Sequence, residues 1–120
     1  DLTVSFSWVA LQWPMFFAVC VASPVLEEYV FRGLLYEAVD ARWPRVWPSG
    51  ARLSISFANA MTTWLFVIAH MFARDPIAGA LVLLPSIYLG LLRARYGGIG
   101  VCMLVHAAWN IGWFSLFPPA

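Results

Sequence analysis

The sequence predicts an all-α membrane protein, a polytopic transmembrane bundle of four to five helices with a polar site between them. Of the 120 residues, 62% are hydrophobic and 11% are charged, whereas soluble domains usually carry about 25% charged residues. Four runs without Asp, Glu, Lys or Arg cover residues 2–26, 53–73, 76–92 and 96–120, and a helix that crosses a bilayer needs roughly 20 mainly apolar residues. Four polar side chains nonetheless lie in or beside these runs: Glu27, His70, His106 and Asn110.

The first two apolar segments, residues 4–22 and 24–42, predict one kinked helix. Pro24 interrupts the pattern, with Ser23 before it as a candidate N-cap. The link is too short for the chain to reverse between two full spans, so a kinked continuation is favoured over two separate helices.

Three further helices are predicted over residues 53–72, 77–94 and 99–117. Residues 42–52 are predicted to form a loop, because their prolines, glycine and arginines are unfavourable within a membrane-spanning helix. Shorter connections follow at residues 74–76 and at the glycines after residue 96. Within 77–94, three residues are expected to bend the helix or to allow close packing: Gly79, Pro85 and Gly90.

The arginines predict the orientation. Two helices separate loop 42–52 from turn 93–97, so both lie on one side, and together they carry Arg42, Arg45, Arg52, Arg93 and Arg95. The opposite loop carries only Arg74, beside Asp75. The positive-inside rule therefore places loops 42–52 and 93–97 in the cytoplasm, with Trp43 and Trp47 in an interfacial aromatic belt.

Composition also narrows the partners. A net charge of +1 without a basic cluster gives no case for nucleic acid. Cys20 and Cys102 lie in apolar runs without metal-ligand spacing and are interpreted as small buried hydrophobic residues. The chain begins at Asp1 rather than Met, so we expect residues 1–120 to be one domain of a longer protein.

The motif EEYVFR over residues 27–32 combines two carboxylates with one arginine. Glu28 and Arg32 are four residues apart on one helical face and can pair, which would neutralise both charges. Glu27 is rotated by about 100° from Glu28 and stays available. Glu27 is therefore predicted to react, with Glu28 and Arg32 in support; the competing interpretation is a helix end whose charges face headgroups.

Two further motifs supply the imidazoles, FVIAH over residues 66–70 and HAAWN over residues 106–110. His106 and Asn110 are four residues apart and project together. The rise per residue of a helix allows all four polar groups to lie at a common depth in the membrane. Taken singly, His70 could be an interface group bonded to water, and the His106–Asn110 pair could join two helices. His70 shares a stripe that is expected to face other helices with Asn59, Thr63 and Phe66.

A glutamate, two histidines and an asparagine at one point suit hydrolysis of an acyl bond without a covalent intermediate. The glutamate can take a proton from water and return it to the leaving group. One histidine can orient the water, and a His–Asn pair can donate to the oxyanion. The alternative is a metal, since Glu27, His70 and His106 form a recognised zinc ligand set, although no HExxH is present.

Three motifs in this order resemble the CAAX protease and bacteriocin-processing family (CPBP, also called Abi) of intramembrane glutamic endopeptidases. The family pattern is EExxxR, FxxxH and HxxxN on successive helices, and this chain has Glu27-Glu28-xxx-Arg32, Phe66-xxx-His70 and His106-xxx-Asn110. The match covers residues 20–112, with Pro24 and the FRG of residues 31–33 in agreement.

The resemblance implies a helical membrane fold in which Glu27 and His70 activate water, His106 and Asn110 form the oxyanion hole, and Glu28 and Arg32 support the site. It implies no cofactor, with a divalent metal such as zinc as the alternative. It also implies a bilayer, a prokaryotic plasma membrane, and a peptide or protein substrate with a membrane-proximal segment: CAAX-like and lipidated, bacteriocin-type, or a sorted tail. Family members usually have more spans, so N-terminal helices are expected to be missing.

Two other functions stay open. A non-catalytic membrane immunity or scaffold protein would keep the fold, although it has no use for costly buried polar groups. A proton-coupled transporter fragment would also use intramembrane glutamate and histidine, although the chain shows no internal repeat.

Overall fold

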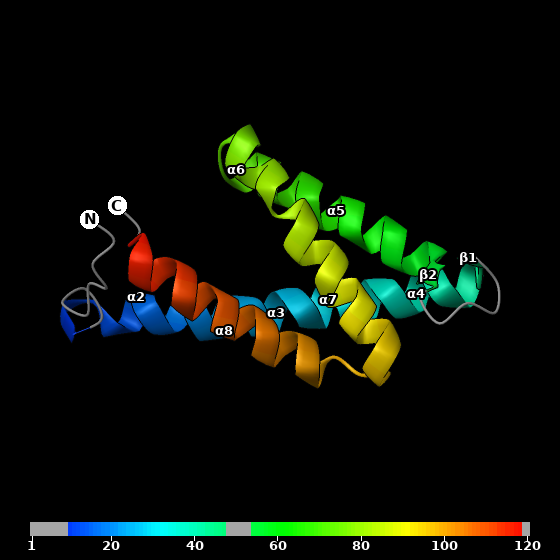
Figure 1. Cartoon of the computed structure of the whole chain (residues 1–120), viewed down its shortest axis with the longest axis horizontal. Helices are drawn as coiled ribbons and strands as arrows, with labels where there is room; N and C mark the ends of the chain where they lie inside the picture. The colour runs from blue at the N-terminus through cyan, green and yellow to red at the C-terminus, as the bar shows by residue number, and fades with distance from the viewer. Residues whose placement is uncertain (1–9, 48–53, 119–120) are drawn as a thin grey trace.

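The computed structural model describes residues 10–47 and 54–118. Nearly all of these residues are helical, which confirms the all-α prediction, and a two-stranded hairpin of four residues is the one addition within the described part. Figure 1 shows a long first helix, a helical hairpin that packs against one half of it, and a last helix along the other half.

The first helix is continuous from Trp13 to Arg42, as the kinked-continuation prediction requires. Ser23 is not an N-cap, because it lies inside this helix with φ −62° and ψ −52°. The irregularity around Pro24 takes the form of π-helical turns instead. The five consecutive segments are α2 (Trp13–Phe17), η1 (Ala18–Ala22), α3 (Ser23–Glu28), η2 (Tyr29–Leu35) and α4 (Tyr36–Arg42), where η denotes a π-helix.

The second helix begins later than predicted because a small hairpin precedes it. Strand β1 (Val46–Trp47) pairs antiparallel with β2 (Ile55–Ser56). Ser56 then caps α5 (Phe57–Ala73), since its hydroxyl accepts a hydrogen bond of 3.0 Å from the Asn59 N–H. The remainder of the predicted loop, residues 48–53, lies outside the described residues.

The predicted helix over 77–94 is two helices, α6 (Pro76–Leu81) and α7 (Leu83–Tyr96). The break is at Val82, where ψ is −4°, rather than at Pro85. Asp75 caps α6, and Gly97 ends α7 at φ 71°, a left-handed conformation that favours glycine. The last helix, α8 (Gly100–Leu116), agrees with the predicted 99–117 within two residues.

Packing places α8 along η1 and α3, and the α5–α6–α7 hairpin against η2 and α4 (Figure 1). Gly79 and Gly90 allow close packing, as predicted: Gly79 faces the backbone of α5, and Gly90 faces the side chain of Asn59. Arg93 near the end of α7 lies 3.6 Å from Glu37 at the start of α4. The end of α7 therefore lies near α4, the helix that leads into strand β1. This proximity agrees with the prediction that loops 42–52 and 93–97 lie on the same side of the membrane.

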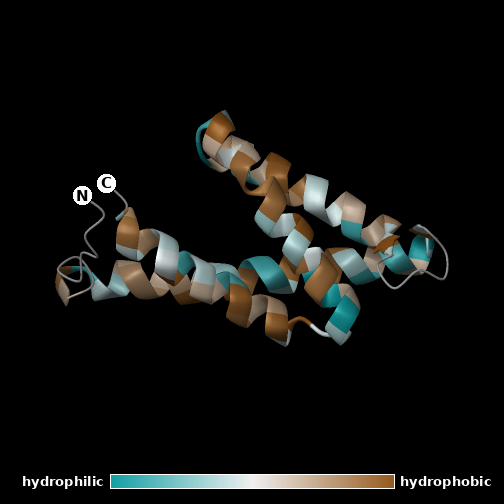
Figure 2. Ribbon diagram, viewed as in Figure 1, coloured by the Kyte–Doolittle hydropathy of each residue, from teal (hydrophilic) through white to brown (hydrophobic). Residues whose placement is uncertain are grey.

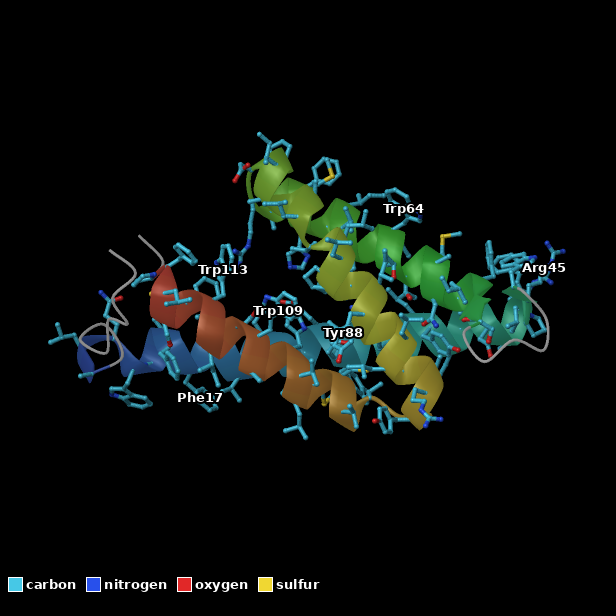
Figure 3. All side chains as sticks on the ribbon, viewed as in Figure 1. Phe17, Arg45, Trp64, Tyr88, Trp109 and Trp113 are labelled. Atoms are coloured by element: carbon cyan, nitrogen blue, oxygen red, sulfur yellow. The ribbon has the colours of Figure 1, made fainter. Side chains whose placement is uncertain are left out.

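Burial is inverted relative to a soluble protein. The fully buried side chains include Arg32, Glu28, Thr62 and Ser86, whereas Leu104, Ile77 and many other large apolar residues are exposed. Hydrophobic residues run along the helices (Figure 2), and large apolar side chains such as Phe17 point away from the bundle (Figure 3). Polar groups inside and apolar groups outside suit a bilayer as solvent.

Two helices are long and apolar enough to cross a membrane by length and composition, Trp13–Arg42 and Pro76–Tyr96. The latter counts α6 and α7 together. The other two apolar helices, Phe57–Ala73 and Gly100–Leu116, have 17 residues each, at the lower limit of roughly 17–25 residues for a span. The count of four to five spans and the cytoplasmic side of the loops remain predictions.

Replacing Gly79 by alanine is expected to lower the thermal unfolding midpoint in detergent. The added Cβ would lie 2.5 Å from the Met71 Cα and nitrogen, so α5 and α6 would have to move apart at a cost of about 1–3 kcal/mol. Gly112→Ala is the matched control, because a Cβ there meets nothing within 4 Å and alanine favours a helix by up to about 1 kcal/mol. Equal midpoints for the two variants would contradict the close contact of α5 and α6.

Candidate active site

The carboxylate of Glu27 lies between two imidazoles that come from different helices. Glu27 Oε2 is 3.7 Å from Nε2 of His70 on α5 and 3.7 Å from Nε2 of His106 on α8. These distances exceed the range of roughly 2.7–3.2 Å for a direct hydrogen bond, and a water molecule beside the three atoms could bond to them. The three predicted groups therefore converge on one small space.

The two oxygens of Glu27 have different surroundings. Oε1 accepts a short hydrogen bond from the hydroxyl of Ser23, one helical turn earlier. Oε2 is buried and receives no hydrogen bond from any described residue. Ser23 thus holds the carboxylate by one oxygen and leaves the other directed at the imidazoles.

Both imidazoles are held by their other ring nitrogen. His70 Nδ1 lies 2.9 Å from the carbonyl oxygen of Phe66, and His106 Nδ1 lies 2.8 Å from Glu28 Oε1. A carbonyl and an ionised carboxylate only accept hydrogen bonds, so the hydrogen is assigned to Nδ1 in both rings. In the neutral state, each Nε2 then presents a lone pair toward Glu27.

Glu27 Oε2 and the two neutral Nε2 atoms are three hydrogen-bond acceptors that face the same space. A water molecule has two hydrogens to donate, so it cannot satisfy Glu27 Oε2 and two neutral Nε2 atoms at once. A further proton on Glu27 or on one imidazole completes the arrangement. The geometry can therefore accommodate one water molecule together with one additional proton.

Glu28 and Arg32 form a buried ion pair next to the site, as their spacing of four residues predicts. Glu28 and Arg32 are 0% and 1% exposed, and Arg32 Nη1 lies 3.3 Å from Glu28 Oε1. Arg32 Nη2 donates to both oxygens of Ser86 on α7, at 2.6 Å to Oγ and 2.9 Å to the carbonyl. Since Glu28 also accepts from His106, a chain of contacts runs from α7 through the first helix to the imidazole on α8.

The ring of Phe66 fills the space between these groups. It stacks on His70 with centroids 4.2 Å apart and lies 4.6 Å from the guanidinium carbon of Arg32. Phe31 packs edge-on against it at 5.1 Å. Phe66 therefore fixes the plane of His70 and covers the charged pair with an aromatic face.

Asn110 lies at the same site, but its side chain bonds to the backbone rather than to another side chain of the site. Its Nδ2 donates a hydrogen bond of 2.9 Å to the carbonyl oxygen of Val19 in η1. Asn110 also lines a cavity of about 70 Å³ with His70, His106 and Phe66. The predicted pair of His106 and Asn110 thus faces one cavity, and one of the two amide hydrogens remains available to it.

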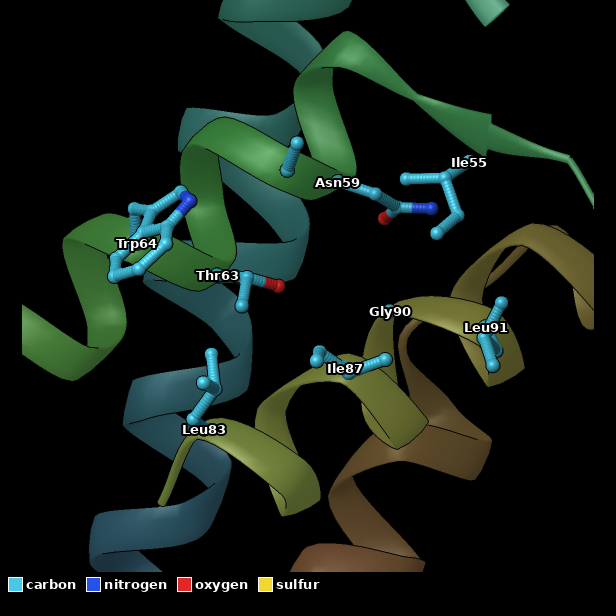
Figure 4. Close-up of a pocket in the computed structure, with 9 residues that line it drawn as sticks. Ile55, Asn59, Thr63, Trp64, Leu83, Ile87, Gly90 and Leu91 are labelled. Atoms are coloured by element: carbon cyan, nitrogen blue, oxygen red, sulfur yellow. The ribbon is translucent and has the colours of Figure 1, made fainter. Parts of the chain in front are cut away.

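A larger cavity of about 240 Å³ lies between α5 and α7 (Figure 4). Apolar side chains such as Trp64, Leu83 and Ile87 line most of it, with Asn59 and Thr63 on the α5 side. These two residues continue the α5 stripe that carries Phe66 and His70. All but His70 on this stripe are buried, which confirms that the stripe faces other helices.

Three groups of the site were not predicted from the sequence: the hydroxyl of Ser23, Ser86 and the backbone carbonyl of Val19. Ser23 was interpreted as a cap, although its spacing of four residues from Glu27 is a local signal for the contact observed. Ser86 has no local signal, because 54 residues separate it from Arg32. The carbonyl of Val19 could not be found from residue types at all, because it is a backbone atom.

In the metal alternative, which the sequence does not favour, the ligands would be Glu27, His70 and His106. Within the described ranges, no three His, Cys, Asp or Glu side chains are grouped as a metal site in their present positions. Their chemistry nevertheless suits a metal, because two imidazoles with hydrogen-bonded Nδ1 atoms and one carboxylate are common ligands. A metal would require these side chains to draw closer together.

Fold and site together describe a helical protein with exposed apolar helix faces and a Glu–His cluster among its helices. The family model described as type II CAAX prenyl endopeptidase Rce1-like matches residues 8–112. The chain therefore belongs to the Rce1-like family of CAAX-type proteases, in agreement with the resemblance of its motifs. No curated protein and no solved structure matches the chain.

Replacing Arg32 by methionine is expected to destabilise the protein by about 3–5 kcal/mol, because it leaves the buried Glu28 carboxylate without its cation. The double variant Glu28→Gln/Arg32→Met is expected to regain a large part of this loss, since no unpaired charge remains. Denaturation in detergent measures both. A double variant at least as unstable as Arg32→Met would show that the pair does not act as a unit.

Proposed function

We propose that this protein is an intramembrane endopeptidase in which Glu27 and His70 activate a water molecule. The observation that carries the proposal is the convergence of Glu27 Oε2 on His70 Nε2 and His106 Nε2, at 3.7 Å from each. The side chain of Glu27 is 25% exposed, but Oε2 itself is buried and receives no hydrogen bond from the described residues, so the atom that would take the proton is enclosed by the helices.

The reaction begins with water between Glu27 and the two imidazoles. Glu27 Oε2 takes one proton from this water, while the water oxygen attacks the carbonyl carbon of the scissile peptide bond. His70 accepts the other hydrogen at Nε2 and orients the attacking lone pair. Ser23 keeps Glu27 Oε1 occupied, so that the proton goes to Oε2.

The tetrahedral intermediate carries a negative oxygen that needs donors. Asn110 supplies its second Nδ2 hydrogen. His106 can donate from Nε2 only as an imidazolium, because its Nδ1 hydrogen is committed to Glu28. It therefore carries the one further proton of the resting site on Nε2 and keeps it through the whole cycle. Glu28 stabilises that cation in the way that the aspartate of a catalytic triad stabilises its histidine.

Collapse of the intermediate breaks the carbon–nitrogen bond. Glu27 returns the proton that it took from water to the leaving nitrogen, so the protein ends the cycle in its initial protonation state. No bond forms between the protein and the substrate at any step.

We favour a lipidated, CAAX-like peptide as the substrate over a bacteriocin-type peptide or a sorted tail. The cavity of about 240 Å³ between α5 and α7 supports this choice, because it offers apolar surface along the same α5 stripe that carries His70. The substrate would lie at the membrane, in a prokaryotic plasma membrane, with loops 42–52 and 93–97 cytoplasmic.

Zinc or another divalent metal is the alternative at the same three side chains, Glu27, His70 and His106. When bound, it would supply a water that ionises near neutral pH. The roles of Glu28 and Arg32 as supports would be unchanged.

Replacing Glu27 by glutamine is expected to reduce cleavage of a prenylated CAAX peptide by about 10²–10⁴-fold, because the group that takes the proton from water is lost. Glutamine preserves the size of the side chain and can keep the contact with Ser23. The assay uses the full chain reconstituted in lipid. The matched control is Glu37→Gln, a carboxylate that is 71% exposed and outside the site, and it is expected to cleave at the wild-type rate.

Retention of near wild-type cleavage by Glu27→Gln would contradict the mechanism. In the same assay, a chelator that abolishes wild-type cleavage, with recovery on addition of zinc, would favour the metal alternative. Cleavage of a prenylated peptide but not of its unprenylated counterpart would support the lipidated substrate.

A further inference from the structure

The backbone of the first helix leaves one carbonyl without its usual donors just before the catalytic segment. In a regular α-helix, the Ser23 N–H would donate to Val19, but here it donates to Ala18, in the π-helical register. The next residue in that register is Pro24, which has no N–H. The carbonyl oxygen of Val19 is therefore passed over by both residues that could ordinarily bond to it.

Asn110 takes up this carbonyl from another helix. Its Nδ2 donates to the Val19 oxygen at 2.9 Å, across 91 residues of sequence. The two hydrogens of a carboxamide are fixed in the plane of the group, so a bond through one of them sets the direction of the other. Asn110 also lines the site cavity, so the hydrogen that is not bonded to Val19 is the one that can serve as a donor there.

We infer that Pro24 and the backbone carbonyl of Val19 are positioning groups for Asn110. Pro24 acts through the missing N–H: it keeps the Val19 carbonyl open, and the carbonyl in turn aims the amide of Asn110. This inference rests on the proposed function, because it assigns Asn110 a donor role in the intermediate.

The same proline precedes Glu27 by three residues, within one helical turn. Pro24 is fully buried, and the π-turn η1 ends directly before the segment Ser23–Glu28 that carries the reactive carboxylate. The irregularity thus lies next to the segment that carries Glu27, and its open carbonyl meets the amide of Asn110 on α8.

The test is a double-mutant cycle on kcat for peptide cleavage by the full chain, with Pro24→Ala, Asn110→Ala and the double variant. Alanine restores the N–H, so helix hydrogen bonding can reclaim the Val19 carbonyl. Pro24→Ala alone is expected to lower kcat by about 10²-fold, the order of loss for misplaced groups, with little change in KM. In the Asn110→Ala background, Pro24→Ala is expected to change kcat little. Independent, multiplicative effects on kcat would overturn the inference.

Pro76→Ala is the control for loss of a proline, because Pro76 is exposed at the first turn of α6, and its kcat is expected to equal that of the wild type. Should Pro24→Ala fail to fold, an isotope-labelled Val19 carbonyl provides a second readout. Its NMR shift is expected to move in Asn110→Ala, and an unchanged shift would overturn the inference. Full cleavage by Asn110→Ala together with a moved Val19 shift would overturn the donor role instead, and the proposed function would fail separately from the contact.

Discussion

The hydrogen bond between the Glu28 carboxylate and His106 is the interaction on which the rest of the site depends. Glu28 is wholly buried, and its Oε1 accepts from His106 at 2.8 Å and from Arg32 at 3.3 Å. This contact assigns the hydrogen to Nδ1 of His106 and leaves Nε2 to face Glu27. Without it, neither the tautomer nor the plane of His106 would be defined.

Burying an ion pair in such a protein has a cost that local contacts must offset. Desolvation of two charges can exceed their mutual attraction unless further hydrogen bonds satisfy both groups. Here His106 bonds to one oxygen of the carboxylate, and Ser86 and the face of Phe66 contact the guanidinium. Glu28 Oε2 and Arg32 Nε make no hydrogen bond with the described residues, so the desolvation cost is offset only in part. The network therefore joins the first helix to α5, α7 and α8, the same helices that bring the reactive groups together. A membrane bundle that lacks a hydrophobic drive between helices can use such polar contacts to fix its arrangement.

Local spacing predicted the parts of the site that lie within one helix. The pairing of Glu28 with Arg32, the buried stripe of α5 and the continuous first helix follow from separations of three or four residues and from a link too short to reverse. Contacts between helices could not be read in the same way. No feature of the sequence around Ser86 predicts its contact with Arg32, because 54 residues separate the two.

Backbone detail also lay beyond the sequence pattern. A proline and a preceding serine suggest a helix start, but an i to i−5 hydrogen bond lets the helix continue through both residues. The hairpin before α5 and the break at Val82 are likewise set by chain geometry rather than by periodicity. Such irregular turns are frequent at functional sites, and the two π-segments here flank the glutamates.

The most direct test of the shared-water site is an experimental structure of the wild-type protein that resolves ordered solvent and is recorded with anomalous scattering. We expect one water molecule within hydrogen-bonding distance of Glu27 Oε2, His70 Nε2 and His106 Nε2, with the Nδ1 atoms bonded to Phe66 and Glu28. A direct bond between Glu27 and an imidazole that closes the space, or a separation of the three side chains beyond the reach of one water, would contradict it. An anomalous peak at that position would replace the water by a metal.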